Sequence, residues 1–327
     1  MENLISVIVV TYNQEDTIGR TLDSILMQQC HLPIEIIIGE DGSTDSTRTI
    51  CQKYAERYPD VIRLFANDHN KGVVDNYFDC LLACRGKFIA DCAGDDFWVD
   101  ELKLEKASRL MEDNDRITLV HTAWEYYNEQ THVTTASPQQ PFPEPLTNGR
   151  DMLEAILTQT NMPVIHLCTS LYRAETILRE YHAHTELFRD SKWGCEDLQI
   201  AFFMARDGLI AYLPDVTLHY SQGMETVSDP KDEKKRFRFF QRVTSLSYRL
   251  AQDFHIQGKR VDTFFSRRSF TLLMHAFRAH DKALRQEAID CCRQWGAQTT
   301  CTYKVVKMVT SNDLLWSLAL QLRKQFR

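Results

Sequence analysis

A run of glycine, acidic and hydroxyl residues spans positions 39–46 and directly follows an aliphatic segment. One interpretation is structural, because Ser43 or Thr44 can cap the helix that follows and Asp45 favours the positive end of its dipole. Asp41 precedes that cap and ends the preceding strand. A carboxylate there can accept from a base imide N–H or a ribose hydroxyl, so we predict a ligand-binding role for Asp41 and a structural one for Asp45.

A second acidic pair, Asp95 and Asp96, follows the apolar stretch 87–92 and is preceded by Gly94. An ordinary acidic turn is one interpretation. The pair also suits a hard divalent cation, whose remaining ligands would be diphosphate oxygens and water. Its place at the end of a strand in the same predicted sheet as Asp41 favours the cation.

The first hundred residues alternate aliphatic runs with helical patterns, which indicates βαβ units. The expected strands are 4–10, 34–38, 61–65 and 87–92, and the expected helices are 17–29, 43–58 and 74–84. The predicted fold class is therefore α/β, with a doubly wound, mostly parallel sheet. Ligands of such sheets bind at the carboxyl ends of the strands, where Asp41, Asp95 and Asp96 fall.

The rest of the chain divides into an irregular part and a helical part. At 327 residues the chain exceeds what a single core usually holds. We expect a domain over 1–230, in two halves at 1–100 and 101–230, and a helical region over 231–327. Further expected elements are helices 101–115, 152–157, 196–206, 236–256, 262–280, 282–295 and 312–326, strands 117–121 and 164–172, and a Pro-rich surface loop at 131–148.

The composition is that of a packed globular protein, with 43% hydrophobic and 25% charged residues, and it argues against a disordered chain. The ten cysteines lack zinc-type spacing and are expected as reduced thiols. Cys80 and Cys84 lie one helical turn apart, but the sequence has no second Cys/His pair that would complete a zinc site with them. The first residues do not resemble a secretory leader and no run of about 18 apolar residues occurs, so we expect a cytoplasmic protein.

Five short motifs, taken together in their order and spacing, resemble family 2 glycosyltransferases of the GT-A fold. They are SVIVVTYN at 6–13, EDGSTD at 40–45, NKG at 70–72, RG at 85–86 and GDDFW at 94–98. The resemblance is clear over about the first 100 residues and extends weakly to about residue 228. It implies an enzyme that uses a nucleotide-diphosphate-sugar donor, often a UDP-sugar, and inverts the anomeric carbon.

The resemblance also implies roles for individual residues. The donor-binding residues would be Thr11, Tyr12, Glu15, Asp41, Lys71 and Asp95. Asp96, together with Asp95, would coordinate Mn²⁺ or Mg²⁺. The family's first metal-site carboxylate falls on Ala93 here, so cation binding must depend on Asp95 and Asp96.

The resemblance implies that residues 1–100 form the donor half of the domain and that residues 101–230 form its acceptor half. Two further positions correspond to residues on the acceptor side of the family. Glu196 and Asp197 open a predicted helix, where acidic residues also simply favour the dipole. The family's second carboxylate is the usual general base, which favours Asp197 over Glu196; either could instead hold the acceptor. His219 lies near a family histidine that reaches the metal, but with Ser228 aligned it falls on a tyrosine of the family pattern, and a lone histidine is more often structural.

The charge is unevenly distributed along the chain. Residues 231–327 hold 20 Lys and Arg against 8 Asp and Glu, whereas the whole chain has a net charge of −7. Such a basic, helical tail is expected to pack as a solvated bundle, with peripheral contact to an anionic membrane surface as the alternative. No nucleic-acid-binding motif accompanies the charge.

The predicted function is therefore a metal-dependent hexosyltransferase that acts on a glycan, polysaccharide or lipid-linked acceptor. A catalytically silent nucleotide-sugar-binding protein is one alternative, supported by Ala93. A sugar nucleotidyltransferase is another, but the loop Thr11–Glu15 offers neither a glycine nor a cation to cradle a triphosphate.

Overall fold

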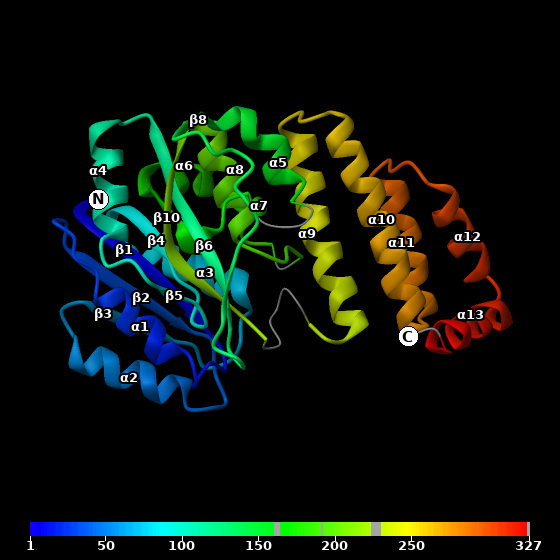
Figure 1. Ribbon diagram of the computed structural model, residues 1–327, viewed down its shortest axis with the longest axis horizontal. Helices are drawn as coiled ribbons and strands as arrows, with labels where there is room; N and C mark the ends of the chain where they lie inside the picture. The colour runs from blue at the N-terminus through cyan, green and yellow to red at the C-terminus, as the bar shows by residue number, and fades with distance from the viewer. Residues whose placement is uncertain (160–163, 191, 224–229, 326–327) are drawn as a thin grey trace. The chain divides into compact units, whose positions relative to one another are not determined.

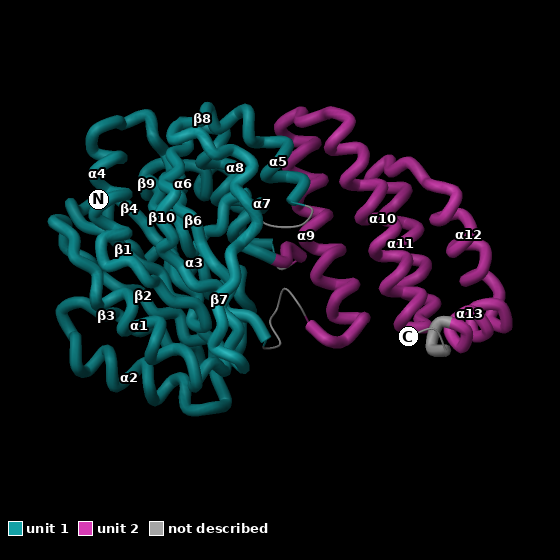
Figure 2. The backbone as a smooth tube through the Cα atoms, in the orientation of Figure 1, with its two compact units in different colours: residues 1–191, 195–224 teal, residues 192–194, 225–327 magenta. Residues whose placement is uncertain are grey.

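The computed structural model describes residues 1–159, 164–190, 192–223 and 230–325 and divides into two compact units. Figure 2 shows them: one contains Met1–Ser191 and Cys195–Met224, the other Lys192–Gly194 and Glu225–Arg327. The first unit is a mixed α/β domain and the second is built of helices (Figure 1). We describe each unit by itself.

The first unit opens with the alternation of strands and helices that the sequence predicts. Its first elements are β1 (Glu2–Thr11), α1 (Ile18–Leu26), β2 (Ile34–Glu40), α2 (Thr47–Arg57), β3 (Ile62–Ala66), α3 (Val73–Ala83), β4 (Gly86–Asp91), β5 (Phe97–Trp98) and α4 (Lys103–Asp113). The remaining elements are β6 (Ile117–Asn128), β7 (Thr134–Ala136), β8 (Leu146–Asn148), α5 (Leu153–Leu157), β9 (Leu171–Arg173), α6 (Ala174–Ala183), α7 (Thr185–Phe188), α8 (Asp197–Asp207) and β10 (Leu209–Gln222), with short 3-10 turns at Gly149–Met152 and Leu167–Thr169.

All the long strands belong to one mostly parallel sheet, in the order β3-β2-β1-β4-β9-β6-β10-β5. The pairs β1/β2, β2/β3, β1/β4 and β6/β10 are parallel, and β9 is antiparallel to both β4 and β6. It follows that β1, β2, β3, β4, β6 and β10 all run in one direction. Their carboxyl ends share one edge of the sheet and their amino ends the other.

Helices cover both faces of this sheet, which confirms the predicted doubly wound class. Ile5, Val7 and Val9 of β1 pack in one cluster with residues of α1, α2 and α4. α3 lies on the other face, since a Cβ on Gly39 of β2 would come within 2.5 Å of the Cys80 sulfur. The middle of β1 is buried on both faces, as the unbroken aliphatic run predicts.

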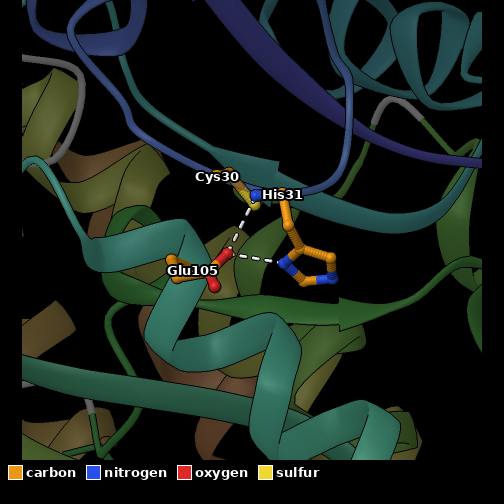
Figure 3. A group of neighbouring side chains, drawn as sticks. All are labelled: Cys30, His31 and Glu105. Atoms are coloured by element: carbon orange, nitrogen blue, oxygen red, sulfur yellow. Dashed lines mark hydrogen bonds and ion pairs between the residues drawn. The ribbon is translucent and has the colours of Figure 1, made fainter.

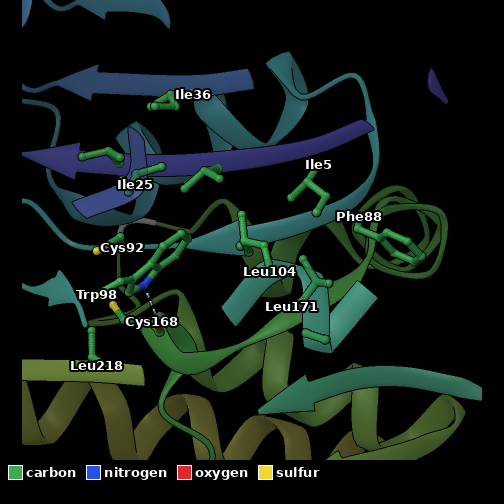
Figure 4. Packing of buried hydrophobic residues seen from close by; sticks show 14 of the residues in the cluster. Ile5, Ile25, Ile36, Phe88, Cys92, Trp98, Leu104, Cys168, Leu171 and Leu218 are labelled. Atoms are coloured by element: carbon green, nitrogen blue, oxygen red, sulfur yellow. Dashed lines mark hydrogen bonds between the residues drawn. The ribbon is translucent and has the colours of Figure 1, made fainter. Parts of the chain in front are cut away.

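The core below the carboxyl edge centres on Trp98, which is 1% exposed (Figure 4). Its indole nitrogen donates to the Cys168 carbonyl oxygen at 3.0 Å, which satisfies a polar group that would otherwise be buried without a partner. Cys92, Leu171 and Leu218 belong to the same cluster. This packing joins the end of β5 to segments from the second half of the unit.

Four details differ from the sequence-based prediction. The strand expected at 164–172 is wrong: it contains a 3-10 turn at Leu167–Thr169 and only the short β9, because a short buried apolar run has no periodicity that identifies a strand. The helix expected from Ser43 begins at Thr47. Loop 131–148 includes β7 and β8. The long strand β10 and helices α6 and α12 were not predicted.

The second unit consists of helices α9 (Glu233–Asp253), α10 (Lys259–Ala279), α11 (Lys282–Gln294), α12 (Cys301–Val309) and α13 (Asp313–Gln325). Side-chain caps start three of them: Asp232, Asp281 and Thr300 each accept from backbone N–H groups of the following turn. α10 packs against α9, α11 and α12. The predicted helical region is therefore present, and no helix in the described part of the chain is long and apolar enough to cross a membrane.

Candidate active site

The carboxyl edge of the sheet gathers most of the residues that the sequence singled out. Thr11 ends β1, Asp41 follows β2, Asp95 and Asp96 follow β4, and His219 lies near the end of β10. β1 lies between β2 and β4, so Asp41 and the acidic pair flank its end. This is the edge at which open α/β sheets bind their ligands.

The Asp41 carboxylate is 3% exposed and organises the loop after β3. Its two oxygens accept from the Asn67 side-chain amide at 3.0 Å and from the backbone N–H groups of Lys71 and Gly72, both at 2.9 Å. Three of roughly four acceptor positions of the carboxylate are thus used. One remains for a ligand. The Lys71 ammonium pairs with Asp79 at 3.0 Å.

The loops after β1 and β2 are held together by side-chain to backbone hydrogen bonds. Asn13 Oδ1 accepts from Thr44 N at 2.8 Å, and Glu15 Oε2 accepts from Ser46 N at 2.9 Å. Asp45 Oδ1 accepts from Thr47 N at 3.0 Å, so Asp45 performs the capping that we expected of Ser43 or Thr44. The Glu15 carboxylate is therefore already hydrogen-bonded within the protein.

Thr11 ends β1 and Tyr12 follows it, and the two side chains differ in exposure. Tyr12 is 43% exposed, and its ring is open to a ligand. Thr11 is buried, and its hydroxyl donates to Gln14 Oε1 at 2.8 Å.

Gly94 brings the acidic pair close to the end of β1. A Cβ at this position would lie 2.4 Å from Gln14 Oε1 and 2.7 Å from Thr11 Oγ1, so only glycine fits there. The hydroxyls of Thr17 and Thr21 donate to the Gly94 carbonyl oxygen at 2.8 and 3.0 Å. The start of α1 therefore fixes the backbone that carries the two carboxylates.

Asp96 is 1% exposed and carries an unmatched buried oxygen. Its Oδ1 accepts from Ser221 N at 3.0 Å, whereas Oδ2 is buried without a hydrogen-bond partner among the described residues. Burial, and then the neighbouring charge of Asp95, hold the pKa of Asp96 well above its usual range. Burial likewise raises the pKa of Asp95, with Glu129 adding to it. The carboxylate pair and its orphaned oxygen fit a bound cation.

A network that the sequence analysis missed surrounds this pair. Arg20 of α1 forms an ion pair with Glu129 at 2.5 Å and also donates to the Asp95 carbonyl oxygen at 3.3 Å. Ser221 Oγ lies 2.5 Å from that carbonyl oxygen and 2.7 Å from Glu129 Oε1, and its single proton serves one of them at a time. The Arg20 guanidinium also stacks over Phe97, 4.0 Å from the ring centroid.

His219 faces the same region from β10. Its ring stacks on Tyr127 with centroids 5.8 Å apart, Nε2 lies 3.5 Å from Glu125, and Nδ1 is buried without a partner among the described residues. Burial lowers the pKa of His219, which favours the neutral, metal-binding form. Ser228, used to align this histidine, lies outside the described residues.

Asp95, Asp96 and His219 are not assembled as tightly as a ready three-ligand site. In the described residues, one group of three Cys, His, Asp or Glu side chains has its ligand atoms within 4.8 Å of one another, and it is Cys30, His31 and Glu105 (Figure 3). Cys80 of α3 and Cys84, which caps that helix, are buried free thiols, as expected, and do not belong to such a group.

The group of Cys30, His31 and Glu105 is better explained by ion pairs within the protein than by a metal ion. His31 Nδ1 lies 2.5 Å from Glu105, and Nε2 lies 2.9 Å from Glu112, so both ring nitrogens already have carboxylate partners. The backbone N–H of His31, followed by its ring, lowers the pKa of Glu105 to about 2. Both glutamates belong to α4, so these ion pairs hold this helix to the segment that follows α1.

The two acceptor-side carboxylates lie partly exposed at the start of α8. Burial, followed by the charge of Asp197, raises the pKa of Glu196 to about 8; Asp91 at the end of β4 adds to the rise. Burial also raises the pKa of Asp197. A raised pKa makes the deprotonated carboxylate a stronger base.

Comparison with solved structures identifies the class of fold. The chain superposes on S. aureus TarS in complex with UDP-GlcNAc with a TM-score of 0.55 and 16% identity, over 90% of this chain and 92% of that one. It superposes on the mannosyltransferase PcManGT from Pyrobaculum calidifontis, in complex with GDP-Man and Mn²⁺, with a TM-score of 0.55 and 16% identity, over 99% and 88%. The fold is that of GT-A glycosyltransferases.

The sequence identifies the family. The family model described as glycosyl transferase family 2 matches residues 6–178, and the chain belongs to this family. Among curated relatives, the Escherichia coli UDP-Glc:alpha-D-GlcNAc-diphosphoundecaprenol beta-1,3-glucosyltransferase WfaP is 33% identical over 132 residues, which is 40% of this chain and 49% of that protein. The chain matches only about a third of the length of the first curated relatives.

Replacement of Ser221 tests the network around Asp95. Ser221→Ala removes the hydroxyl contact to the Asp95 carbonyl oxygen and to Glu129, and we expect sugar-transfer kcat/KM to fall about 10- to 100-fold, as for loss of a hydrogen bond to a charged group. Ser221→Thr restores the hydroxyl and should recover most of the loss. Equal activity of the alanine variant and the wild type, at equal Tm, would refute the role.

The raised pKa of Glu196 predicts a pH-dependent cost in stability. The folded-state pKa of about 8 exceeds the ordinary 4.5, so the folded state keeps a proton that the unfolded state has lost, and stability declines as the pH rises from about 4.5 through about 8. Glu196→Gln should therefore raise the Tm at pH 8, by roughly 2–4 °C for each kcal/mol recovered, with little change near pH 4.

Thermal unfolding of both proteins across this pH range measures the effect. The exposed Glu56→Gln is the matched control and should shift the Tm by the same small amount at every pH. A Glu196→Gln Tm difference that does not grow with pH would contradict the assignment.

Proposed function

We propose that this chain is an inverting glycosyltransferase that moves a sugar, most simply a hexose from a UDP-sugar, to an acceptor hydroxyl in glycan or polysaccharide assembly. The observation that carries the proposal is the position of Asp41 and of the Asp95–Asp96 pair at the carboxyl edge of the sheet, on either side of the end of β1. The TarS structure is a complex with UDP-GlcNAc, and WfaP is named for UDP-Glc and a lipid diphosphate acceptor. Both names support a nucleotide-sugar donor and a glycan or lipid-linked acceptor.

The donor half would be bound along the ends of β1, β2 and β4. Asp41 would accept from the base, and the exposed ring of Tyr12 would lie beside it. Thr11 and Glu15 shape this pocket through the loop bonds described above, and Lys71 supplies a positive charge next to it. Asp95 would face the ribose.

A divalent cation, Mn²⁺ or Mg²⁺, fits the residues beside this pocket. Asp96 would hold it through the unmatched Oδ2, together with Asp95, and neutral His219 offers a further ligand atom. The cation, when bound, neutralises charge on the donor diphosphate. The PcManGT structure is a complex with GDP-Man and Mn²⁺, which supports this choice of cofactor. The alanine at position 93 means that the protein supplies one carboxylate fewer than the family pattern.

Asp197 or its neighbour Glu196 would accept the proton of the acceptor hydroxyl. As the proton leaves, the acceptor oxygen forms a bond to the anomeric carbon while the bond to the donor diphosphate breaks on the opposite side. A single displacement of this kind inverts the anomeric centre. The electrostatic environment, which raises the pKa of both carboxylates, suits a group that must bind a proton during the reaction.

The Asp96→Asn variant tests the proposal in an assay of nucleotide release from a panel of UDP-, GDP- and dTDP-sugars with Mn²⁺ or Mg²⁺. We expect the wild type to turn over one donor in a metal-dependent manner and the variant to lose about 10²–10³-fold in kcat, because charge stabilisation in the transition state is removed. Asp113→Asn, an exposed acid at the end of α4, is the control and should remain active.

Two outcomes would count against the proposal. Full activity of Asp96→Asn with metal present would exclude the cation role of this residue. The second outcome combines two observations: UDP with Mn²⁺ stabilises the wild type in thermal unfolding, but the wild type turns over none of the donors with any acceptor. This outcome would favour the catalytically silent binding protein.

We also propose that the helical unit contacts an anionic membrane surface. α12 and α13 expose Val305, Met308, Leu314, Leu318 and Leu322, whose exposed fractions run from 48% to 82%. Leu314, Leu318 and Leu322 recur at every fourth residue and form one stripe on α13. The surrounding unit is strongly basic, and an apolar stripe flanked by Lys and Arg is typical of helices that lie in a membrane interface.

Sedimentation with vesicles tests this contact. The wild type should bind vesicles that contain phosphatidylglycerol and bind phosphatidylcholine vesicles weakly, and a Leu314→Ser, Leu318→Ser, Leu322→Ser variant should lose most of the binding. The control changes three exposed aliphatic residues of the other unit: Leu82→Ser, Val133→Ser and Leu146→Ser. Equal binding by both triple variants would contradict the proposal.

A further inference from the structure

A second polar pocket, of about 770 Å³, lies at the amino edge of the sheet. Arg116 immediately precedes β6 and Gly208 immediately precedes β10, while Arg173 ends the antiparallel strand β9. These strand ends share the edge opposite to Asp41 and Asp96. The pocket is therefore separate from the candidate donor site.

Arginine dominates the ionisable groups of this pocket. Five arginines line it, against three carboxylates from Asp115, Glu180 and Asp207; the arginines are Arg116, Arg150, Arg173, Arg179 and Arg206. The lining thus carries an excess of two positive charges. This excess contrasts with residues 1–230 as a whole, in which acidic residues are in the majority.

Two of the arginines are neutralised within the protein. Arg179 Nη2 lies 2.6 Å from Asp207, and Arg206 Nη2 lies 2.6 Å from Glu180. The Glu180 and Asp207 side chains are only 6% and 14% exposed, so these pairs form the wall of the pocket and keep their geometry.

The other three arginines lack such a partner. Arg173 donates to the carbonyl oxygens of Ile117 and Met111, and the carboxylate nearest to it, Asp115, lies 3.7 Å away and is 97% exposed. Burial lowers the pKa of Arg173, which indicates a cation with little compensation. Arg116 and Arg150 are exposed and have no carboxylate within 4.0 Å among the described residues.

We propose that this pocket binds the phosphoryl group of a small soluble sugar phosphate. Arg116, Arg150 and Arg173 would contact the phosphoryl oxygens, since the planar guanidinium fork matches phosphate geometry. A phosphate monoester carries about two negative charges near neutral pH, which matches the excess charge of the lining. The volume exceeds that needed for phosphate alone and falls in the range of small-molecule sites, so the sugar would occupy the remainder.

The polar lining favours a sugar phosphate over a lipid phosphate. Besides the charged residues, the lining includes the polar residues Thr118, Thr176 and Asn148, and Leu209 is its one aliphatic member. Hydroxyl and amide groups suit a sugar ring, whereas acyl chains would need an apolar wall. The inference does not depend on the proposed sugar transfer, because it rests on a different edge of the sheet.

Calorimetric titration of the full chain with inorganic phosphate and with glucose 1-phosphate, at constant ionic strength, tests the inference. We expect both to bind the wild type, the sugar phosphate more tightly. An Arg116→Ala, Arg150→Ala variant should bind at least about tenfold more weakly, which corresponds to about 1.4 kcal/mol. The Arg57→Ala, Arg260→Ala variant removes the same charge from exposed positions outside the pocket and should bind as the wild type does.

The other outcomes would overturn the inference. If neither probe binds the wild type, the pocket is an internal ion-pair cluster and not a ligand site. If both double variants bind the probes equally more weakly, the effect comes from the net charge of the protein and not from this pocket. Loss of phosphate binding in Asp96→Asn, with the arginine variant unaffected, would place the phosphate at the donor edge. Binding to phosphatidic acid vesicles through Arg116 and Arg150, without binding to the soluble probes, would identify a lipid headgroup instead.

Discussion

The contact between Asp96 and Ser221 joins residues 125 positions apart, and the geometry of the candidate active site depends on it. The Ser221 backbone N–H fixes one oxygen of Asp96, and the Ser221 hydroxyl fixes the backbone of Asp95. Because Ser221 belongs to β10 and the acidic pair follows β4, this contact connects the first half of the sheet to its second half. Arg20 and Glu129 then close the network around it.

The site keeps negative charges that the folded protein satisfies only in part. Asp96 has a buried oxygen without a partner among the described residues, and Glu196 and Asp197 repel each other at the start of α8. Charges of this kind lower stability, and proteins retain them where a bound cation or a proton relieves them during function. By contrast, the buried carboxylates of Glu35 and Glu40 have cationic partners: Glu35 accepts from Ser6 and Arg85, and Glu40 accepts from Arg48.

The two edges of the sheet have opposite electrostatic character. At the carboxyl edge, acidic groups outnumber their cationic partners, which suits a cation and a proton acceptor. At the amino edge, Arg116, Arg150 and Arg173 exceed their carboxylate partners, which suits an anion. One sheet can present both because the loops at its two ends are independent in sequence, while the buried strands between them are constrained only to be apolar.

The sequence by itself determined the elements whose signals are local. The aliphatic runs of β1, β2 and β4 and the helical patterns of α1 to α4 were predicted correctly, and the positions of Asp41, Asp95 and Asp96 at strand ends followed from them. The tertiary structure alone decided the rest. It placed Arg20, Glu129 and Ser221 beside Asp95, turned the apolar run 164–172 into a 3-10 turn and a short strand, and formed β10 beside β6. These features depend on pairing between distant segments and on burial, which the pattern of neighbouring residues does not encode.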